Sequence, residues 1–382
     1  MLIVATGTLG IPPKGGGGLE RVIYEPTKAL SKLGHGVTLI DTASIEERDL
    51  EADLSFCEVI RVRHLNLVKL HSLRFKYLLH EFVRQISLVF YALALIPTMT
   101  RLRCSCKYDI IHVHNRYSYI LQAHGSLPRI GAWRKLKWFY DALFGYKLLR
   151  DASRVIALSR VEAEQYRCMG VPEEKIAIIP NGIDLSEYAN LPPKGSFKKK
   201  FGIKEEEKIV LYLGRIHWIK GVDILVKAFA NVIKKLDNIR LVIVGPDDGY
   251  LSELRALIKA LRIENKVIIA GPLYGRDKLE AYVDADVYVL PSRYEIFSMS
   301  VLEALACGTP VILTENCGIA EYFRDKAGLV VKPDSNHLGE ALLEMLLNQD
   351  KQKVFRENCK TVMQKFNISE TVSKLEKVYQ EL

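Results

Sequence analysis

The sequence is poor in the features that mark disulfide-rich, zinc-binding or secreted proteins. Seven cysteines are scattered over 382 residues, and only Cys104 and Cys106 lie close together. That spacing indicates neither a disulfide framework nor a set of zinc ligands, so we expect free thiols in a reducing cytosol. No basic segment precedes the strand-like residues 2–5, and we therefore expect no signal peptide.

Long hydrophobic runs are also missing. The most apolar stretch, residues 86–99, is shorter than the ~20 residues that a membrane-spanning helix needs. A buried helix is the simplest interpretation, and a helix lying on a membrane surface is the alternative.

Motifs for common cofactors, metals and nucleic acids are absent as well. There is no G-x-G-x-x-G or Walker A sequence, and no acidic residue is placed to contact the ribose of NAD. There is no convincing D-x-D cluster, and Asp247 and Asp248 are interpreted as turn residues. No nucleic-acid-binding motif is present. We expect no metal, no resident cofactor and no nucleic-acid partner.

Basic residues are in excess, with 54 Lys and Arg against 45 Asp and Glu and a net charge of +9. They gather at residues 129–150, among aromatic side chains, and at residues 194–200. The first group is either the solvated face of an amphipathic helix or a surface that contacts anionic lipid. We expect a cytoplasmic protein, with peripheral contact to the cytoplasmic membrane face as the open alternative.

Short apolar runs alternate with amphipathic stretches along the whole chain, as in α/β proteins with doubly wound parallel sheets. A proline- and lysine-rich segment at residues 181–202 separates two such series. We expect two Rossmann-like domains, 1–190 and 191–365, with ligands in the cleft at the carboxyl ends of the strands. The expected strands are 3–6, 37–41, 59–62, 110–114, 120–124, 154–158, 176–179, 209–214, 240–245, 267–271, 287–291, 310–314 and 328–331.

Two features of the first half do not fit this pattern easily. Residues 110–114 and 120–124 should be parallel strands, yet only five residues join them, and a parallel crossover usually needs about a dozen. Either they pair differently or the sheet has lost an element. Pro26 interrupts the first helical pattern, where it would kink the helix or force a later start.

The segment 291–310 carries the strongest indication of a binding site. A strand ends near Leu290, a loop carries Glu295, and a helix that contains Glu303 begins near residues 298–300. The free N–H groups at such a helix start bind phosphate well, here those of Phe297, Ser298, Met299 and Ser300. The two carboxylates can accept hydrogen bonds from hydroxyl groups, which suits them to bind a sugar and a ribose. The alternative is a pair of surface glutamates that favour the helix start.

Two further segments follow expected strands. Arg215 and Lys220 come after the strand at 209–214, where they could neutralise a diphosphate or belong to an ordinary cationic loop. A run of four glycines, which includes Gly17 and Gly18, follows the first strand. It is either an anion-binding nest or a flexible loop.

Taken together and in this order, these segments resemble family 4 retaining glycosyltransferases of the GT-B fold. The resemblance covers nearly the whole chain and rests on residues 17–22, 34–37, 122–126, 157–159, 179–184, 213–215 with 220–221, 244–246 and 295–308.

The resemblance implies a role for each matching residue. Arg215 and Lys220 would hold the donor diphosphate, Glu295 and the amides of 297–300 the transferred sugar and phosphate, and Glu303 the ribose. Gly17 and Gly18 would lie near the donor phosphates or the acceptor. His124 would lie beside the reacting sugar, although a core histidine that caps a strand is the alternative.

The resemblance also implies the reaction. A UDP- or GDP-linked sugar would pass to a glycan or lipid-linked acceptor by metal-independent front-face transfer. The last helix, residues 366–382, would return to the N-terminal domain. The alternatives are a catalytically weakened relative that keeps donor binding, a nucleotide-sugar epimerase, a phosphorylase, and a glycosidase that uses Glu295 and Glu303 as acid and base.

Overall fold

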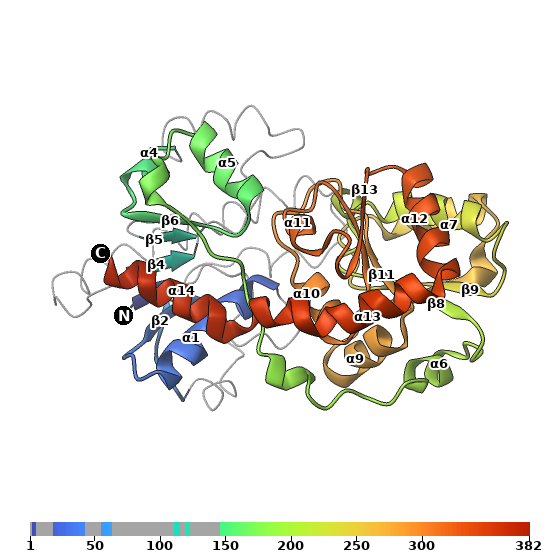
Figure 1. Cartoon of the computed structure of the whole chain (residues 1–382), viewed down its shortest axis with the longest axis horizontal. Helices are drawn as coiled ribbons and strands as arrows, with labels where there is room; N and C mark the ends of the chain where they lie inside the picture. The colour runs from blue at the N-terminus through green and yellow to red at the C-terminus, as the bar shows by residue number, and fades with distance from the viewer. Residues whose placement is uncertain (1, 5–17, 43–54, 63–110, 115–119, 123–145) are drawn as a thin grey trace. The chain divides into compact units, whose positions relative to one another are not determined.

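The structure is a computed structural model that describes residues 2–4, 18–42, 55–62, 111–114, 120–122 and 146–382 (Figure 1). The chain divides into two compact units. Unit 1 comprises Met1–Ala157, Ala163–Ile179 and Thr371–Leu382, and unit 2 comprises Leu158–Glu162 and Pro180–Glu370.

Unit 1 contains a parallel seven-stranded sheet in the order β3-β2-β1-β4-β5-β6-β7. Its strands are β1 (Leu2–Val4), β2 (Thr38–Thr42), β3 (Glu58–Val62), β4 (Ile111–His114), β5 (Ile120–Gln122), β6 (Arg154–Ala157) and β7 (Ile176–Ile178). Among the described residues, the helices with most of their length in unit 1 are α1 (Gly18–Lys32), α4 (Tyr146–Asp151), α5 (Arg160–Cys168) and the last helix, α14 (Ile368–Gln380).

The two strands with the short connection do pair in parallel. His112 lies opposite Ile120 and Val113 lies opposite Leu121, so β4 and β5 are direct neighbours. The expectation that these strands pair differently is therefore wrong, the loss of an element between them stays a prediction, and the sheet runs on without a break from β4 to β7. Residues 115–119, which join the strands, lie outside the described residues.

Pro26 lies inside helix α1. The helix begins at Gly18, so the expectation that the proline forces a later start is wrong. Thr27 Oγ1 donates a hydrogen bond to the Ile23 carbonyl over 2.7 Å, beside the position where proline offers no N–H. Ile23 and Leu30 are fully buried, and we attribute the tolerance of the proline to this packing, which offsets its cost of about 3 kcal/mol.

Helix α14 packs on unit 1, as expected for the last helix of this fold (Figure 1). The Tyr379 hydroxyl lies 2.8 Å from Nδ1 of the buried His112 on β4, and the Glu376 carboxylate lies 2.6 Å from Nε2 of His35. Val372 and Leu375 are buried on the same helix. Apolar burial and polar contacts to two different segments therefore both anchor the end of the chain.

Unit 2 contains a parallel six-stranded sheet in the order β10-β9-β8-β11-β12-β13. Its strands are β8 (Lys208–Leu213), β9 (Ile239–Val244), β10 (Val267–Gly271), β11 (Val287–Leu290), β12 (Val311–Thr314) and β13 (Gly328–Val331). Its helices are α6 (Ser196–Phe201), α7 (Val222–Val232), α8 (Leu251–Ala260), α9 (Gly275–Asp284), α10 (Met299–Ala306), α11 (Ala320–Phe323), α12 (Ser335–Leu347) and α13 (Gln349–Met363).

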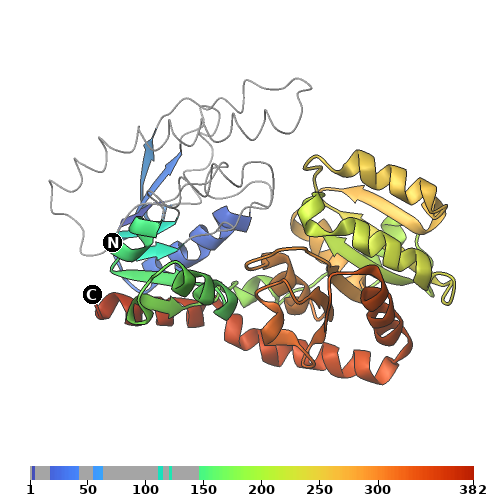
Figure 2. The ribbon, with the colours of Figure 1, turned by 90° about the horizontal axis from the view of Figure 1, so that it is seen from above.

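The strands of unit 2 are apolar because the sheet is covered on both sides (Figure 2). Every residue of β11 and of β12 is buried. Helix α7 packs against α8 and α12, and helix α10 packs against α9 and α13. This is the arrangement of a doubly wound sheet, and the predicted strands agree with the observed ones to within one or two residues.

The strand order of unit 2 reverses between β8 and β11. The chain runs outward from β8 to β9 and β10, and then returns to place β11 on the other side of β8. Ligands of doubly wound sheets bind beyond the carboxyl ends of the strands at such a reversal. The loops that follow β8 and β11 are the ones that carry Arg215, Lys220 and Glu295.

Candidate functional site

The loops after β8 and β11 are in direct contact. Tyr288 of β11 lies opposite Leu211 of β8, so both strands deliver their loops to the same edge of the sheet. Gly221 has φ +68°, and a Cβ atom there would lie 1.9 Å from the carbonyl oxygen of Pro291. The close approach of the two loops thus depends on a residue without a side chain.

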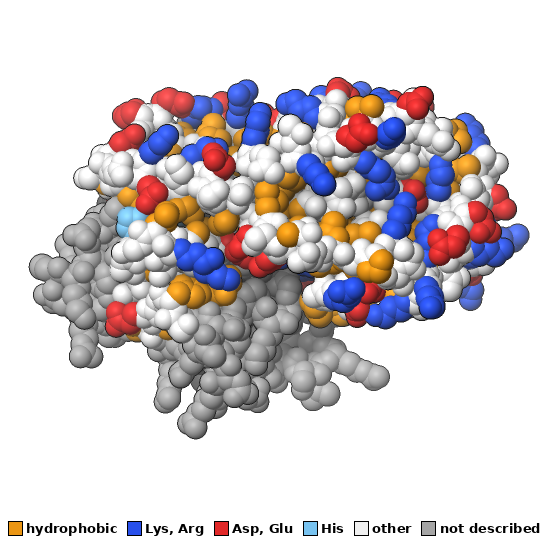
Figure 3. Space-filling view, turned by 60° about the horizontal axis from the view of Figure 1, so that its bottom comes forward, with side chains coloured by type: hydrophobic (Ala, Val, Ile, Leu, Met, Phe, Trp, Pro, Cys, Tyr) orange, Lys and Arg blue, Asp and Glu red, His pale blue; other side chains and the backbone are white. Residues whose placement is uncertain are grey.

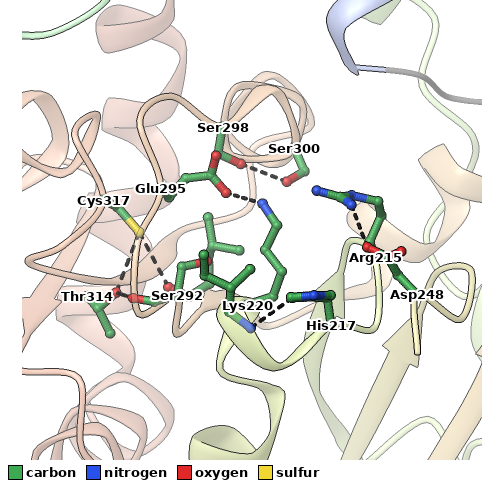
Figure 4. A network of polar contacts seen from close by, with 12 residues as sticks. Arg215, His217, Lys220, Asp248, Ser292, Glu295, Ser298, Ser300, Thr314 and Cys317 are labelled. Atoms are coloured by element: carbon green, nitrogen blue, oxygen red, sulfur yellow. Dashed lines mark hydrogen bonds and ion pairs between the residues drawn. The ribbon is translucent and has the colours of Figure 1, made fainter. Parts of the chain in front are cut away.

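Lys220 and Glu295 meet across this contact and form an ion pair (Figure 4). Their side chains are 17% and 13% exposed, so the pair is largely withdrawn from water but still accessible. The backbone of Glu295 is fixed on the other side, where its N–H donates to the Asn316 carbonyl and its carbonyl accepts from the N–H of Gly318. The backbone that carries the carboxylate is therefore held in place by two hydrogen bonds.

Helix α10 begins just after Glu295 and presents unused hydrogen-bond donors. Ser298 is the N-cap residue but provides no side-chain cap. Within the described part of the chain, the backbone N–H groups of 297–300 donate to no backbone carbonyl or side chain. Such a helix start, with its positive dipole end, favours an anion.

A chain of hydroxyl groups links this helix start to the end of β8. Ser298 Oγ lies 2.9 Å from Ser300 Oγ, and the Tyr288 hydroxyl lies 2.7 Å from the same Ser300 oxygen. Tyr288 also donates to the Leu213 carbonyl over 3.1 Å. Burial raises the pKa of the Tyr288 phenol well above its usual value, so Tyr288 stays a neutral hydroxyl at physiological pH.

Arg215 is the most accessible charged residue of the group, with a side chain 61% exposed. Its guanidinium forms an ion pair with Asp248, and the hydroxyl of Tyr212 donates to its backbone carbonyl over 2.7 Å. Figure 4 shows this guanidinium, the Lys220 ammonium and Ser300 directed toward one region. Two cations and a helix start thus lie at one edge of one sheet.

The two aspartates after β9 have different roles. Asp247 Oδ1 accepts hydrogen bonds from the N–H groups of Gly249, Tyr250 and Leu251, so its interpretation as a turn residue is confirmed. Asp248 forms the ion pair with Arg215, which sequence reasoning missed. Its position directly after the strand beside β8 is the signal that could have found it.

Glu303 lies inside α10 with its side chain only 7% exposed. Lys278 Nζ donates to one carboxylate oxygen over 2.9 Å, and the Tyr282 hydroxyl donates to the other over 3.1 Å. Both partners come from α9, where their spacing of four residues places them on one face. Sequence reasoning missed these partners, which hold Glu303 in a fixed orientation.

Some of the predicted site residues lie outside the described part of the chain. Gly17 and His124 lie outside the described residues, and Gly18 is the first residue of α1. The apolar run at 86–99 and most of the basic, aromatic segment at 129–150 also lie outside them. In the described segments, no group of three His, Cys, Asp or Glu side chains could hold a metal ion. None of the helices described there has both the length and the apolar character needed to cross a bilayer.

The two doubly wound units define a GT-B fold. A crystal structure of Alr3699/HepE from Anabaena in complex with UDP-glucose superposes with a TM-score of 0.76 at 19% identity, covering 100% of this chain and 99% of that one. At this identity the likeness shows the fold alone.

The family follows from the sequence comparisons. Residues 16–187 match the model described as Glycosyltransferase Family 4, and residues 193–362 match the model described as Glycosyl transferases group 1. The chain belongs to the family 4 glycosyltransferases, and the predicted resemblance to this family and its fold is confirmed.

Named relatives cover different shares of the chain. An uncharacterized glycosyltransferase of Methanocaldococcus jannaschii is 30% identical over 249 residues, which are 59% of this chain and 63% of that protein. The N-acetyl-alpha-D-glucosaminyl L-malate synthase of Bacillus anthracis is 26% identical over 308 residues, 76% of this chain and 79% of that one. Against several other relatives the chain spans only 40% to 46% of their length.

Proposed function

We propose that this chain transfers a sugar from a nucleotide-diphosphate sugar to an acceptor hydroxyl, with retention and without a metal ion. The observation that carries the proposal is the convergence of Lys220, Arg215 and the uncapped start of α10 at the strand-order reversal of unit 2. Cations and free amides at one point suit a diphosphate better than any uncharged ligand.

Each residue of the site has a task in this reaction. The bond between the anomeric carbon and the phosphate oxygen breaks, and a bond from that carbon to the acceptor oxygen forms on the same face. The departing phosphate oxygen takes the acceptor proton. Arg215, Lys220 and the amides of 297–300 stabilise the charge that develops on the diphosphate.

The carboxylates bind hydroxyl groups of the donor. Glu295, whose backbone is hydrogen-bonded on both sides, accepts hydrogen bonds from hydroxyl groups of the sugar. Glu303, held by Lys278 and Tyr282, accepts hydrogen bonds from hydroxyl groups of the ribose. Backbone groups near Leu273 and Tyr274 contact the base. The assignments of Gly17 and Gly18 to the donor phosphates or acceptor, and of His124 to the reacting sugar, stay predictions.

A catalytically weakened relative, which keeps donor binding but has lost sugar transfer, is the first alternative, and the pairing of β4 and β5 is relevant to it. The main reason for that alternative is the short connection between these strands. The sheet of unit 1 is continuous there, but only five residues still join the two parallel strands, so the weakened relative stays a prediction. An epimerase remains distinguishable by assay, because it would release a modified sugar without an acceptor.

We expect the nucleotide of the donor to be UDP or GDP, and no resident cofactor to be needed. A panel of UDP-, GDP- and ADP-sugars scored by thermal shift tests this. A donor present at about 100 times its Kd stabilises the fold by roughly 2.7 kcal/mol, which corresponds to a rise in Tm of several degrees. If no member of the panel raises Tm, and none gives heat in a titration, the proposed function fails.

We propose a glycan or lipid-linked acceptor, with contact to a membrane surface through the basic residues at 129–150. The proposal rests on the basic and aromatic composition of that segment; on the described part of the face in Figure 3, basic and acidic side chains are interspersed. We expect the protein to float with vesicles that contain anionic lipid and not with neutral ones. Salt should weaken the association. Equal behaviour with both vesicles would remove the electrostatic basis of the proposal.

A further inference from the structure

Arg293, which the reaction described above does not use, joins the two loops of the site. Its guanidinium donates two parallel hydrogen bonds to the carboxylate of Asp223, each 2.8 Å long. The same group donates to the backbone carbonyl of Trp218 over 2.7 Å, and the backbone N–H of Arg293 donates to the carbonyl of Ile219 over 2.9 Å. Trp218 and Ile219 are the two residues that precede Lys220 in its 3-10 turn.

The partners of Arg293 belong to a fixed part of unit 2. Asp223 is buried in the first turn of α7, directly after the turn that carries Lys220. The guanidinium carbon lies 4.6 Å from the centre of the Trp218 ring, a stacking distance. Trp218 is 44% exposed, so this contact lies at the surface of the site. Arg293 therefore contacts the backbone of the Lys220 turn, the Trp218 ring of that turn, and Asp223 in the helix that follows it.

The residues after Arg293 are held from the opposite side. Asn316 Nδ2 donates to the carbonyl of Arg293 over 3.0 Å, and the Asn316 carbonyl accepts from the N–H of Glu295 over 3.1 Å. The segment from Arg293 to Glu295 is thus placed between the Lys220 turn and the turn after β12. A displacement of Arg293 would change the separation of Lys220 and Glu295.

We propose that Arg293 is a positioning residue that sets the geometry of Lys220 relative to Glu295. The inference rests on the proposed function, in which these two residues contact the donor. The Lys220 ammonium lies at the end of a flexible four-carbon chain, so its position depends on where its short turn is anchored. Catalysis is sensitive to such placement, since a misplacement of about 1 Å can cost 100-fold in rate.

Only arginine supplies all of these contacts. Its planar fork holds the Asp223 carboxylate at two points while a third N–H reaches the Trp218 carbonyl. Lysine keeps the positive charge beside the buried Asp223 but cannot reproduce the fork. Arg293→Lys therefore separates the geometric role from simple charge compensation.

The test starts with Arg293→Lys, measured beside the wild-type protein. We expect kcat for sugar transfer to fall about 10- to 100-fold, with a Tm close to that of the wild type. Lys227→Met is the matched control, because Lys227 approaches the same Asp223 carboxylate at 3.9 Å and, among the described residues, forms no ion pair with either loop. The control should keep its activity. If Arg293→Lys fails to fold, Asp223→Asn removes the anchor of the fork and should give the same loss of kcat.

A double-mutant cycle distinguishes positioning from a general structural effect. If Arg293 acts through Lys220, Arg293→Lys should weaken binding of the nucleoside diphosphate product when Lys220 is present. The same substitution should hardly change that binding when it is added to Lys220→Met. Calorimetry with UDP or GDP, whichever the wild type binds, keeps the cycle measurable when turnover is too slow. Additive losses, or an unchanged kcat in Arg293→Lys, would overturn the inference. A wild-type protein that binds neither nucleotide would instead overturn the proposed function.

Discussion

Lys220→Met is expected to lower kcat for sugar transfer by about 100- to 1,000-fold, the effect of removing one preorganised group that stabilises developing charge. The substitution keeps much of the side-chain volume and removes only the ammonium group. Glu295 would lose the cation with which it is paired. Because both side chains retain contact with water, we expect Tm to fall by only about 2–4 °C.

Steady-state kinetics with a saturating donor would measure this effect, and Lys200→Met is the matched control. Lys200 also forms an ion pair, with Asp277 at 2.7 Å, but both side chains are about half exposed on the surface of unit 2. Loss of such a pair changes stability by about 1 kcal/mol or less and should leave turnover unchanged. A similar loss of kcat in both variants would show that Lys220 has no special role.

Gly221→Ala is expected to destabilise unit 2 by about 2–5 kcal/mol, because two costs add. The residue has φ +68°, which strains any residue that carries a Cβ atom. That atom would also lie 1.9 Å from the Pro291 carbonyl oxygen, so one loop of the site would have to move. Urea unfolding would report the lost stability, and turnover would report the displaced loop.

Gly202→Ala separates these two costs. Gly202 has φ +64°, nearly the same backbone conformation, but nothing lies within 4 Å of a Cβ placed there. Only the conformational strain should remain, about 1–2 kcal/mol, with activity unchanged. If the two alanine variants lose the same stability, the close contact between the loops is not what makes Gly221 necessary.

Local patterns predicted the elements of the structure well. The apolar runs at 209–214 and 287–291 became β8 and β11 because a strand buried on both faces must be apolar throughout. The start of α10 was also predicted correctly, because Glu295, Ser298 and Ser300 precede an apolar run that ends before Gly308. Where local signals conflicted, at Pro26 and at the short link before β5, packing and strand pairing prevailed.

Local sequence patterns did not predict contacts between segments that are distant in the sequence. Arg215 pairs with a residue 33 positions away, Glu303 with one 25 positions away, and Arg293 with one 70 positions away. Each of these pairs depends on the order of strands in the sheet, which no local periodicity encodes. The separate motifs and their chemical character were therefore already present in the linear chain. The partner of Arg215 was set when β9 took its place on one side of β8, and the joining of two loops by Arg293 when β11 took its place on the other.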